Sequence, residues 1–150
     1  MPHSWGAELS PGLGPQHGFG AERLFEKDVF GAFSGTDLEG WLRALSVDTV
    51  LIVGFYSHMC VSTSAREALV RGFDVSIDPD ATGACEIQDP FLGSQTAADV
   101  RRSALLHLVN MGVRLEPNRR NGEPESAARS HVENQLAAPS HLGMPAAARR

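Results

Sequence analysis

Two residues of the sequence, a cysteine and a lysine, combine a reactive side chain with a position where it could do chemistry. Cys60 follows the apolar run 50–55, where a buried strand is expected to turn into a helix. The first turn of a helix presents unpaired amides and the positive end of the helix dipole, which favour a thiolate over a thiol. A thiolate is a nucleophile, and amides of the same turn could hold an oxyanion. The alternative is that Cys60 is a small buried hydrophobe between strand and helix.

Lys27 is the only lysine among the 13 basic residues, and the others are all arginine. The chain therefore uses arginine wherever it needs a solvated cation. A lysine offers a compact ammonium that can change its protonation state, which arginine cannot do. Lys27 is accordingly either an accident of codon usage or part of a site that needs such an amine.

The elements that must position these residues alternate between strand and helix. The run 49–55 is apolar and β-branched without alternation, which predicts a parallel strand covered on both faces. The order predicts the fold class: α/β, three-layer α/β/α with a mostly parallel sheet. The expected elements are a short strand at 23–27, a helix opening at 36–39, a strand at 49–55, a helix at about 57–71, a strand at 73–77, a turn-rich loop at 79–93, a helix from about 96 to 111 and a last strand at 113–115.

Two of the expected helices carry a sequence signal for their first turn. Thr36 and Glu39 have the spacing of a capping box, in which the hydroxyl and the carboxylate satisfy exposed amides. Thr96 is expected to cap the last helix. The residues expected to face inward at helical spacing are Leu38, Trp41, Leu42 and Leu45 in the first helix, and Val100, Ala104, Leu108 and Met111 in the last.

Composition limits the classes of protein. The chain of 150 residues carries 18 acidic and 13 basic side chains, a net charge of −5, which argues against a nucleic-acid surface. No apolar run approaches the roughly 18 residues of a membrane span. Two cysteines are too few for a disulfide scaffold, so a cytoplasmic location is expected. Residues 1–116 are expected to form one partial domain, and 117–150, rich in Ala, Pro, Ser, Asn and Arg, a disordered low-complexity tail.

Several motifs also follow one another in a fixed order from Trp5 to Leu115. They are Lys27-x-x-x-x-Ala32-Phe33-x-Gly35-Thr36-x-Leu38, then Val53-Gly54-Phe55-Tyr56-Ser57-His58-Met59-Cys60-Val61, then Thr63, Ala65-Arg66, Ala68, Arg71-Gly72-Phe73 and Asp78. In order and spacing this set resembles the isochorismatase-like cysteine hydrolases, a superfamily that includes nicotinamidases and N-carbamoylsarcosine amidohydrolase. The resemblance implies their Rossmann-like topology.

The resemblance also implies a mechanism. Cys60 matches the nucleophile, which attacks the carbonyl of a small amide, imide or carbamoyl group to form a thioester that water hydrolyses. Lys27 matches the lysine that keeps the cysteine ionised. Phe55–Tyr56 matches a cis peptide, and the amides of Tyr56 and Cys60 match an oxyanion hole. The expected partner is a small-molecule substrate, and a homo-oligomer is compatible with the resemblance.

Other residues keep two interpretations. Phe33 matches an aromatic near the pocket mouth, although core packing explains it equally well. His58 either contacts substrate or makes a structural hydrogen bond at the start of the helix, and Asp78 is expected to be a structural acceptor. The remaining histidines show no ligand spacing, so no metal and no cofactor are assigned. Arg66 is expected at a surface or interface, and Cys85 to be incidental.

The resemblance is incomplete at its start. It implies a first strand and helix, with a catalytic aspartate ending that strand, ahead of Lys27. The acids ahead of Lys27 are Glu8, Glu22 and Glu26, none of them in a matching context. We therefore expect a hydrolase impaired in this chain, because its start lies too far downstream or because the chain is a remnant. The alternative is an inactive relic that acts as a binding or oligomerisation module.

Overall fold

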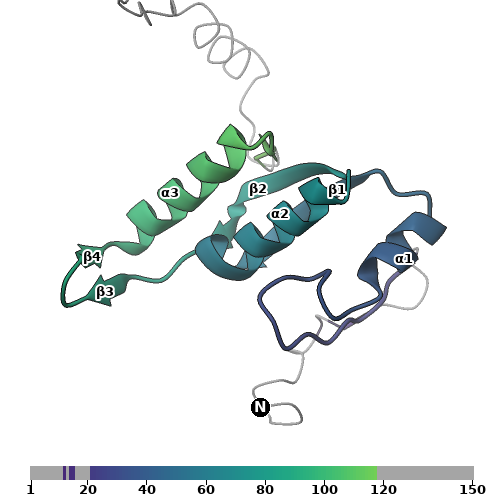
Figure 1. Ribbon diagram of the computed structural model, residues 1–150, viewed down its shortest axis with the longest axis horizontal. Coiled ribbons are helices and arrows are strands. Elements are labelled where there is room, and N and C mark those ends of the chain that lie inside the picture. The colour runs from purple at the N-terminus through teal and green to yellow at the C-terminus, as the bar shows by residue number, and fades with distance from the viewer. Residues whose placement is uncertain (1–11, 13, 16–20, 118–150) are drawn as a thin grey trace, which may run out of the picture. The chain divides into compact units, whose positions relative to one another are not determined.

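The computed structural model of the chain describes residues 12, 14–15 and 21–117 (Figure 1). The expected tail, apart from Pro117, lies outside the described residues and stays a prediction. The elements are helix α1 (Leu38–Ala44), strand β1 (Thr49–Phe55), π-helical turn η2 (Ser57–Val61), helix α2 (Ser62–Val70), strand β2 (Asp74–Gly83), strands β3 (Ile87–Asp89) and β4 (Gly93–Gln95), helix α3 (Ala97–Asn110) and strand β5 (Arg114–Leu115).

The main sheet is parallel and has the strand order β1-β2-β5. The turn η2 and helix α2 connect β1 to β2, and α3 lies between β2 and β5 in the chain. This arrangement confirms the predicted α/β class with a mostly parallel sheet. The expected loop at 79–93 is partly wrong, because β2 extends to Gly83 and the residues after it form the antiparallel pair β3–β4.

The hydrophobic core lies on one face of the sheet. Alternate residues of β1 and β2 point into it and meet the three helices; they are Val50, Ile52, Val75 and Ile77, packed with Leu38, Leu42, Ala65, Ala68, Leu105 and Leu108. The other face of β1 carries Leu51, Val53 and Phe55, which are 57%, 54% and 70% exposed. The expectation that this strand is covered on both faces is therefore wrong for the described residues. Of the three predicted layers, those residues supply the sheet and one layer of helices.

The segment before β1 departs from two sequence predictions. No strand forms at 23–27; Phe25 instead packs edge-on against Trp41, with ring centroids 5.7 Å apart. The capping box is also wrong, because the Glu39 carboxylate pairs with Arg71 rather than with the helix start. Thr36 does act locally, since its Oγ1 accepts from the Leu38 amide at 3.2 Å. A strand needs a partner strand, which only the tertiary fold supplies. A carboxylate prefers a cation, and Glu39 has Arg71 from the tertiary fold and Arg43 from its own helix.

The last helix agrees better with its prediction. Thr96 Oγ1 accepts from the Asp99 amide at 3.2 Å, which confirms the expected N-cap. Val100, Ala104 and Leu108 are buried as expected. Met111 is 42% exposed, so its inward orientation was wrong; it is the C-cap residue, where the helix ends.

Candidate functional site

The chain turns sharply where β1 ends. The peptide bond between Phe55 and Tyr56 is cis, and the turn η2 that follows contains Cys60. The Val61 amide donates to the Tyr56 carbonyl, five residues back, at 3.2 Å, which gives the turn its wider π-helical form. Ser57 is fully buried, and its hydroxyl donates to the carbonyl of Gly83 at the end of β2 at 2.9 Å. The start of the turn is thereby tied to the carboxyl ends of β1 and β2.

Lys27 approaches Cys60 although 33 positions separate them in the sequence. Lys27 Nζ lies 3.5 Å from Cys60 Sγ, 2.9 Å from the carbonyl oxygen of Val29 and 3.3 Å from that of Phe30. An ammonium has three N–H donors and no acceptor, so each of its protons has a partner here. Cys60 is partly buried and is a free thiol. The fold therefore brings the amine and the thiol that the sequence singled out within hydrogen-bonding distance of each other.

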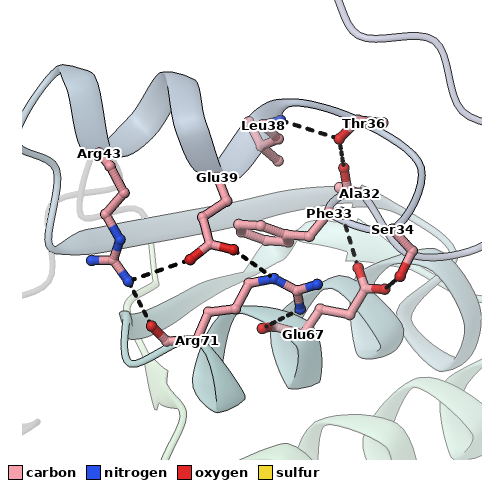
Figure 2. Close-up of polar contacts among 9 residues, drawn as sticks. All are labelled: Ala32, Phe33, Ser34, Thr36, Leu38, Glu39, Arg43, Glu67 and Arg71. Carbon is pink, nitrogen blue, oxygen red and sulfur yellow. Dashed lines mark hydrogen bonds and ion pairs between the residues drawn. The ribbon is translucent and has the colours of Figure 1, made fainter.

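One side of the helical segment from η2 through α2 binds the chain segment 27–39. We call this side the clamp face and define it by Cys60, Ser64, Glu67 and Arg71, which recur every three or four residues. Along the segment, Lys27 Nζ donates to Cys60 Sγ and the Ala32 amide donates to Ser64 Oγ (3.0 Å). Figure 2 shows the other three bonds: the Phe33 amide donates to Glu67 Oε2 (3.0 Å), the Ser34 hydroxyl to Glu67 Oε1, and Arg71 Nε to Glu39 Oε2 (3.1 Å).

Glu67 is the acceptor at the centre of the clamp face. Its partial burial alone would raise the pKa of the carboxyl. The hydrogen bonds from the Ser34 side chain and from the amides of Phe33 and Ser34, together with the charge of Arg71, outweigh burial and lower the pKa of Glu67 from its ordinary value of 4.5. The carboxylate is therefore ionised at neutral pH.

Sequence reasoning did not identify Ser64 and Glu67 as members of the site. Their spacing of four and seven residues from Cys60 was a usable signal, because it places all three on one side of a helix. The partner loop 31–36, Gly-Ala-Phe-Ser-Gly-Thr, has no apolar period and is rich in small residues. Its backbone amides therefore need acceptors from elsewhere in the fold.

Phe55 and Tyr56, which share the cis peptide, differ in their surroundings from Phe33, which was predicted for the pocket. Phe33 is 6% exposed and packs against Phe73 with ring centroids 5.7 Å apart, so it belongs to the core. The structure therefore supports the packing interpretation of Phe33 over a place at the pocket mouth. Phe55 and Tyr56 are 70% and 43% exposed, on the surface beside η2.

His58 lies on the other side of the same helical segment. We call this side the cavity face and define it by His58, Ser62 and Arg66. They line a cavity of about 220 Å³ together with Ile87, Gln95, Val100, Ser103, Ala104 and His107. His58 Nδ1 is buried and has no hydrogen-bond partner among the described residues, so the structural hydrogen bond expected for this residue is not found at that atom. Arg66, expected at the surface, is exposed and donates to Ser62 Oγ at 3.3 Å.

The remaining expectations concern residues away from Cys60. Asp78 is buried and its Oδ1 accepts from the Asp80 amide at 2.8 Å, as expected of a structural acceptor. Cys85 is an exposed free thiol. Within the described part of the chain, no three His, Cys, Asp or Glu side chains are grouped so that they could hold a metal ion. No helix of that part is both long enough and apolar enough to cross a bilayer.

Comparisons with known proteins agree on one family. Residues 1–103 match the model of an isochorismatase domain. The chain is 36% identical over 63 residues to nicotinamidase 3 of Arabidopsis thaliana, which covers 42% of this chain and 32% of that protein. It is 30% identical over 80 residues to N-carbamoylsarcosine amidase of an Arthrobacter species, which covers 53% of this chain and 29% of that protein.

A solved structure extends the similarity to the fold. The cysteine hydrolase of Pseudomonas syringae pv. phaseolicola superimposes with a TM-score of 0.71 and 28% sequence identity, over 77% of this chain and 53% of that one. The chain thus spans about a third of the length of the two curated relatives and about half of the solved structure.

Proposed function

The chain belongs to the isochorismatase family, and from this premise we propose that it carries the nucleophile of a cysteine-dependent hydrolase. The proposed substrate is a small molecule with an amide, imide or carbamoyl-type C–N bond. The observation that carries the proposal is the 3.5 Å separation of Lys27 Nζ and Cys60 Sγ. The substrate class is supported by the names of two relatives, a nicotinamidase and an N-carbamoylsarcosine amidase.

In the proposed reaction the Cys60 thiolate attacks the carbonyl carbon and forms a C–S bond. The amides of Tyr56 and Cys60, in one turn of the chain, would donate to the oxyanion that develops on the carbonyl oxygen. The C–N bond then breaks and the leaving nitrogen takes up a proton from solvent, which the thiol returns to solvent when it ionises for the next turnover. Water adds to the resulting thioester, releasing the acid and regenerating the thiol. Lys27 would hold the sulfur in its ionised form between turnovers, because its ammonium donates toward Sγ.

Turnover would also need a general base. The resemblance implies a catalytic aspartate ahead of Lys27, and the acids in the described segment ahead of that residue are Glu22 and Glu26. A general base contributes about 10²–10⁴-fold to proton-transfer steps, whereas alkylation of the thiol needs no such base. Thiol reactivity and turnover therefore need separate measurements.

The test compares the two cysteines of the chain. Cys60→Ala should abolish ammonia release from nicotinamide or N-carbamoylsarcosine and remove the site that iodoacetamide labels fastest at about pH 6.5, where an unperturbed thiol is only about 1% ionised. Cys85→Ala is the matched control, since Cys85 is also free and is the more exposed of the two. Full turnover in Cys60→Ala, or faster labelling of Cys85 than of Cys60, would rule the proposal out.

A second candidate is an inactive relic that serves as an oligomerisation module. The observation that favours it is the exposed apolar row Leu51, Val53 and Phe55 on β1, since such rows mark contact surfaces. It predicts ordinary, slow alkylation of Cys60 together with self-association that Val53→Lys weakens in sedimentation velocity. For either candidate we propose a cytoplasmic location, because two cysteines are too few for a disulfide scaffold.

A further inference from the structure

The Glu67 carboxylate accepts two hydrogen bonds from the loop that follows Lys27. Its Oε2 accepts from the Phe33 amide at 3.0 Å and its Oε1 accepts from the Ser34 hydroxyl (Figure 2). Gly31 is buried directly beneath it, and a methyl group added at Gly31 would overlap the carboxylate. The loop therefore passes as close to Glu67 as a backbone can.

The same loop holds the amine. Lys27 Nζ donates to the carbonyls of Val29 and Phe30, which immediately precede Gly31. Ser64 and Glu67 bind the amides of Ala32 and Phe33, which come directly after this stretch of backbone. A continuous series of contacts therefore connects Glu67 to the loop, the loop to Lys27, and Lys27 to Cys60 Sγ.

We propose that Glu67 is a positioning residue for the reactive pair, holding loop 31–34 against α2 so that Lys27 Nζ stays within reach of Cys60 Sγ. The inference rests on the proposed function, in which that pair does the chemistry. Glu67 follows Cys60 by seven residues, about 10 Å along a helix, so it acts through the loop and not on the reacting atoms. Because one helical segment carries both the thiol and the carboxylate, the sulfur and the anchor of the loop that holds the amine belong to a single rigid element.

The carboxylate has features that a simple packing contact lacks. It supplies two acceptor oxygens to two neighbouring donors of one loop, and it is ionised, which strengthens both hydrogen bonds. Glu39, which lies in α1 and faces the clamp face, offers a contrast. It pairs with Arg71 and Arg43 through side chains and has no bond to loop 31–34. Glu39→Gln is therefore the matched control for a change at Glu67.

The experiment measures the rate at which iodoacetamide alkylates Cys60 between about pH 5 and pH 9, a readout of thiolate reactivity that needs no substrate. Glu67→Ala should slow alkylation at pH 6 by about 5- to 10-fold and move the profile toward higher pH, because the cation near the sulfur is no longer held. Glu67→Gln should keep most of the rate, since its amide can accept from Phe33 and donate to Ser34. Glu39→Gln should leave the profile unchanged.

A double-mutant cycle separates positioning from general loss of structure. If Glu67 acts through the amine, then Glu67→Ala should have no further effect on alkylation once Lys27→Met is present. Additive effects of the two changes would overturn the positioning role and leave the proposed function intact. An unchanged profile in Lys27→Met alone would instead overturn the proposed function.

Gly31→Ala tests the same contact if Glu67→Ala does not fold. Gly31→Ala leaves Glu67 in the chain but displaces its carboxylate from the loop. It should slow alkylation of Cys60 as Glu67→Ala would, while Glu67→Gln stays near the wild-type rate. Wild-type alkylation in Gly31→Ala would overturn the positioning role.

Discussion

The two sides of the segment from η2 through α2 carry similar numbers of polar side chains, but these side chains differ in their hydrogen-bond partners. On the clamp face, Ser64 and Glu67 each bind the loop after Lys27, and Arg71 pairs with Glu39. On the cavity face, His58 leaves a buried ring nitrogen without a partner among the described residues. The guanidinium of Arg66 binds the hydroxyl of Ser62 and the sulfur of Met111.

The difference shows why residue type alone does not locate a reactive site. By residue type, a histidine, a serine and an arginine beside a cavity of about 220 Å³ would be candidates for a catalytic site. The clamp face, however, is the one where every bond limits where a neighbouring group can move, and it contains the thiol. Holding groups in place before substrate arrives lowers the barrier of a reaction, while loosely held groups contribute little.

The largest effect should come from removing the amine that the clamp face positions. Lys27→Met keeps an unbranched side chain, one atom shorter, and deletes its charge, so alkylation of Cys60 at pH 6 should fall by about 10- to 100-fold. Lys27→Arg should restore part of the rate, because the charge returns without the compact geometry of an ammonium. A rate equal to that of the wild type in Lys27→Met would show that the 3.5 Å approach has no chemical consequence.

The next effect tests a bond of the clamp face that does not involve charge. Ser64 is 7% exposed and its hydroxyl accepts from the Ala32 amide at 3.0 Å. Ser64→Ala should lower the free energy of unfolding by about 1 kcal/mol, since it leaves that amide without its acceptor. Urea denaturation measures the change, and Ser62→Ala on the cavity face is the control, expected within about 0.5 kcal/mol of the wild type. Equal losses in the two variants would remove the distinction between the faces.

A smaller effect should appear in acid. The pKa of Glu67 is lowered in the folded chain, so folding releases its proton, and the stability it contributes is present above its ordinary pKa of 4.5. As the pH falls below about 4.5, the unfolded chain takes up the proton first, and this contribution is lost as the pH passes through the lowered pKa. Because the group is partly exposed, solvent screening keeps the effect below about 1 kcal/mol.

Denaturant melts from about pH 6 to pH 3 measure this effect as the difference between the wild type and Glu67→Gln. The difference in stability should narrow as the pH falls, since glutamine has no proton to take up. A difference that stays constant across that range would contradict the lowered pKa of Glu67.

The sequence was sufficient for some elements of this comparison and not for others. The apolar run of β1 and the N-cap at Thr96 are local signals, and both elements formed as predicted. Strand β2 runs on to Gly83 because it pairs with β1 again beyond a shift in register after Ile52, which is a property of two segments together. The exposed face of β1 likewise depends on which segments lie over it.

The bonds of the clamp face could not be predicted from the sequence, because they too join segments that are far apart in the chain. Glu67 accepts from a backbone amide of a loop whose sequence has no apolar period. Every residue except proline has such an amide, so the sequence does not indicate which one a carboxylate will bind. Glu39 was predicted to cap α1 because its spacing from Thr36 fits a capping box. Its actual partner, Arg71, is 32 residues away, and a spacing rule weighs only neighbours. The approach of Lys27 to Cys60 was anticipated from a family resemblance and not from any local pattern.

The smallest effect should come from the cavity face, and its sign is informative. His58→Phe removes a buried ring nitrogen that has no partner among the described residues, and a buried polar atom without a hydrogen bond is destabilising. The free energy of unfolding should therefore stay the same or rise by under about 1 kcal/mol, with alkylation of Cys60 unchanged. A loss of more than about 1 kcal/mol, or slower alkylation, would mean that His58 holds a partner. The two sides of the helical segment would then be built in the same way, and the thiol would depend on both.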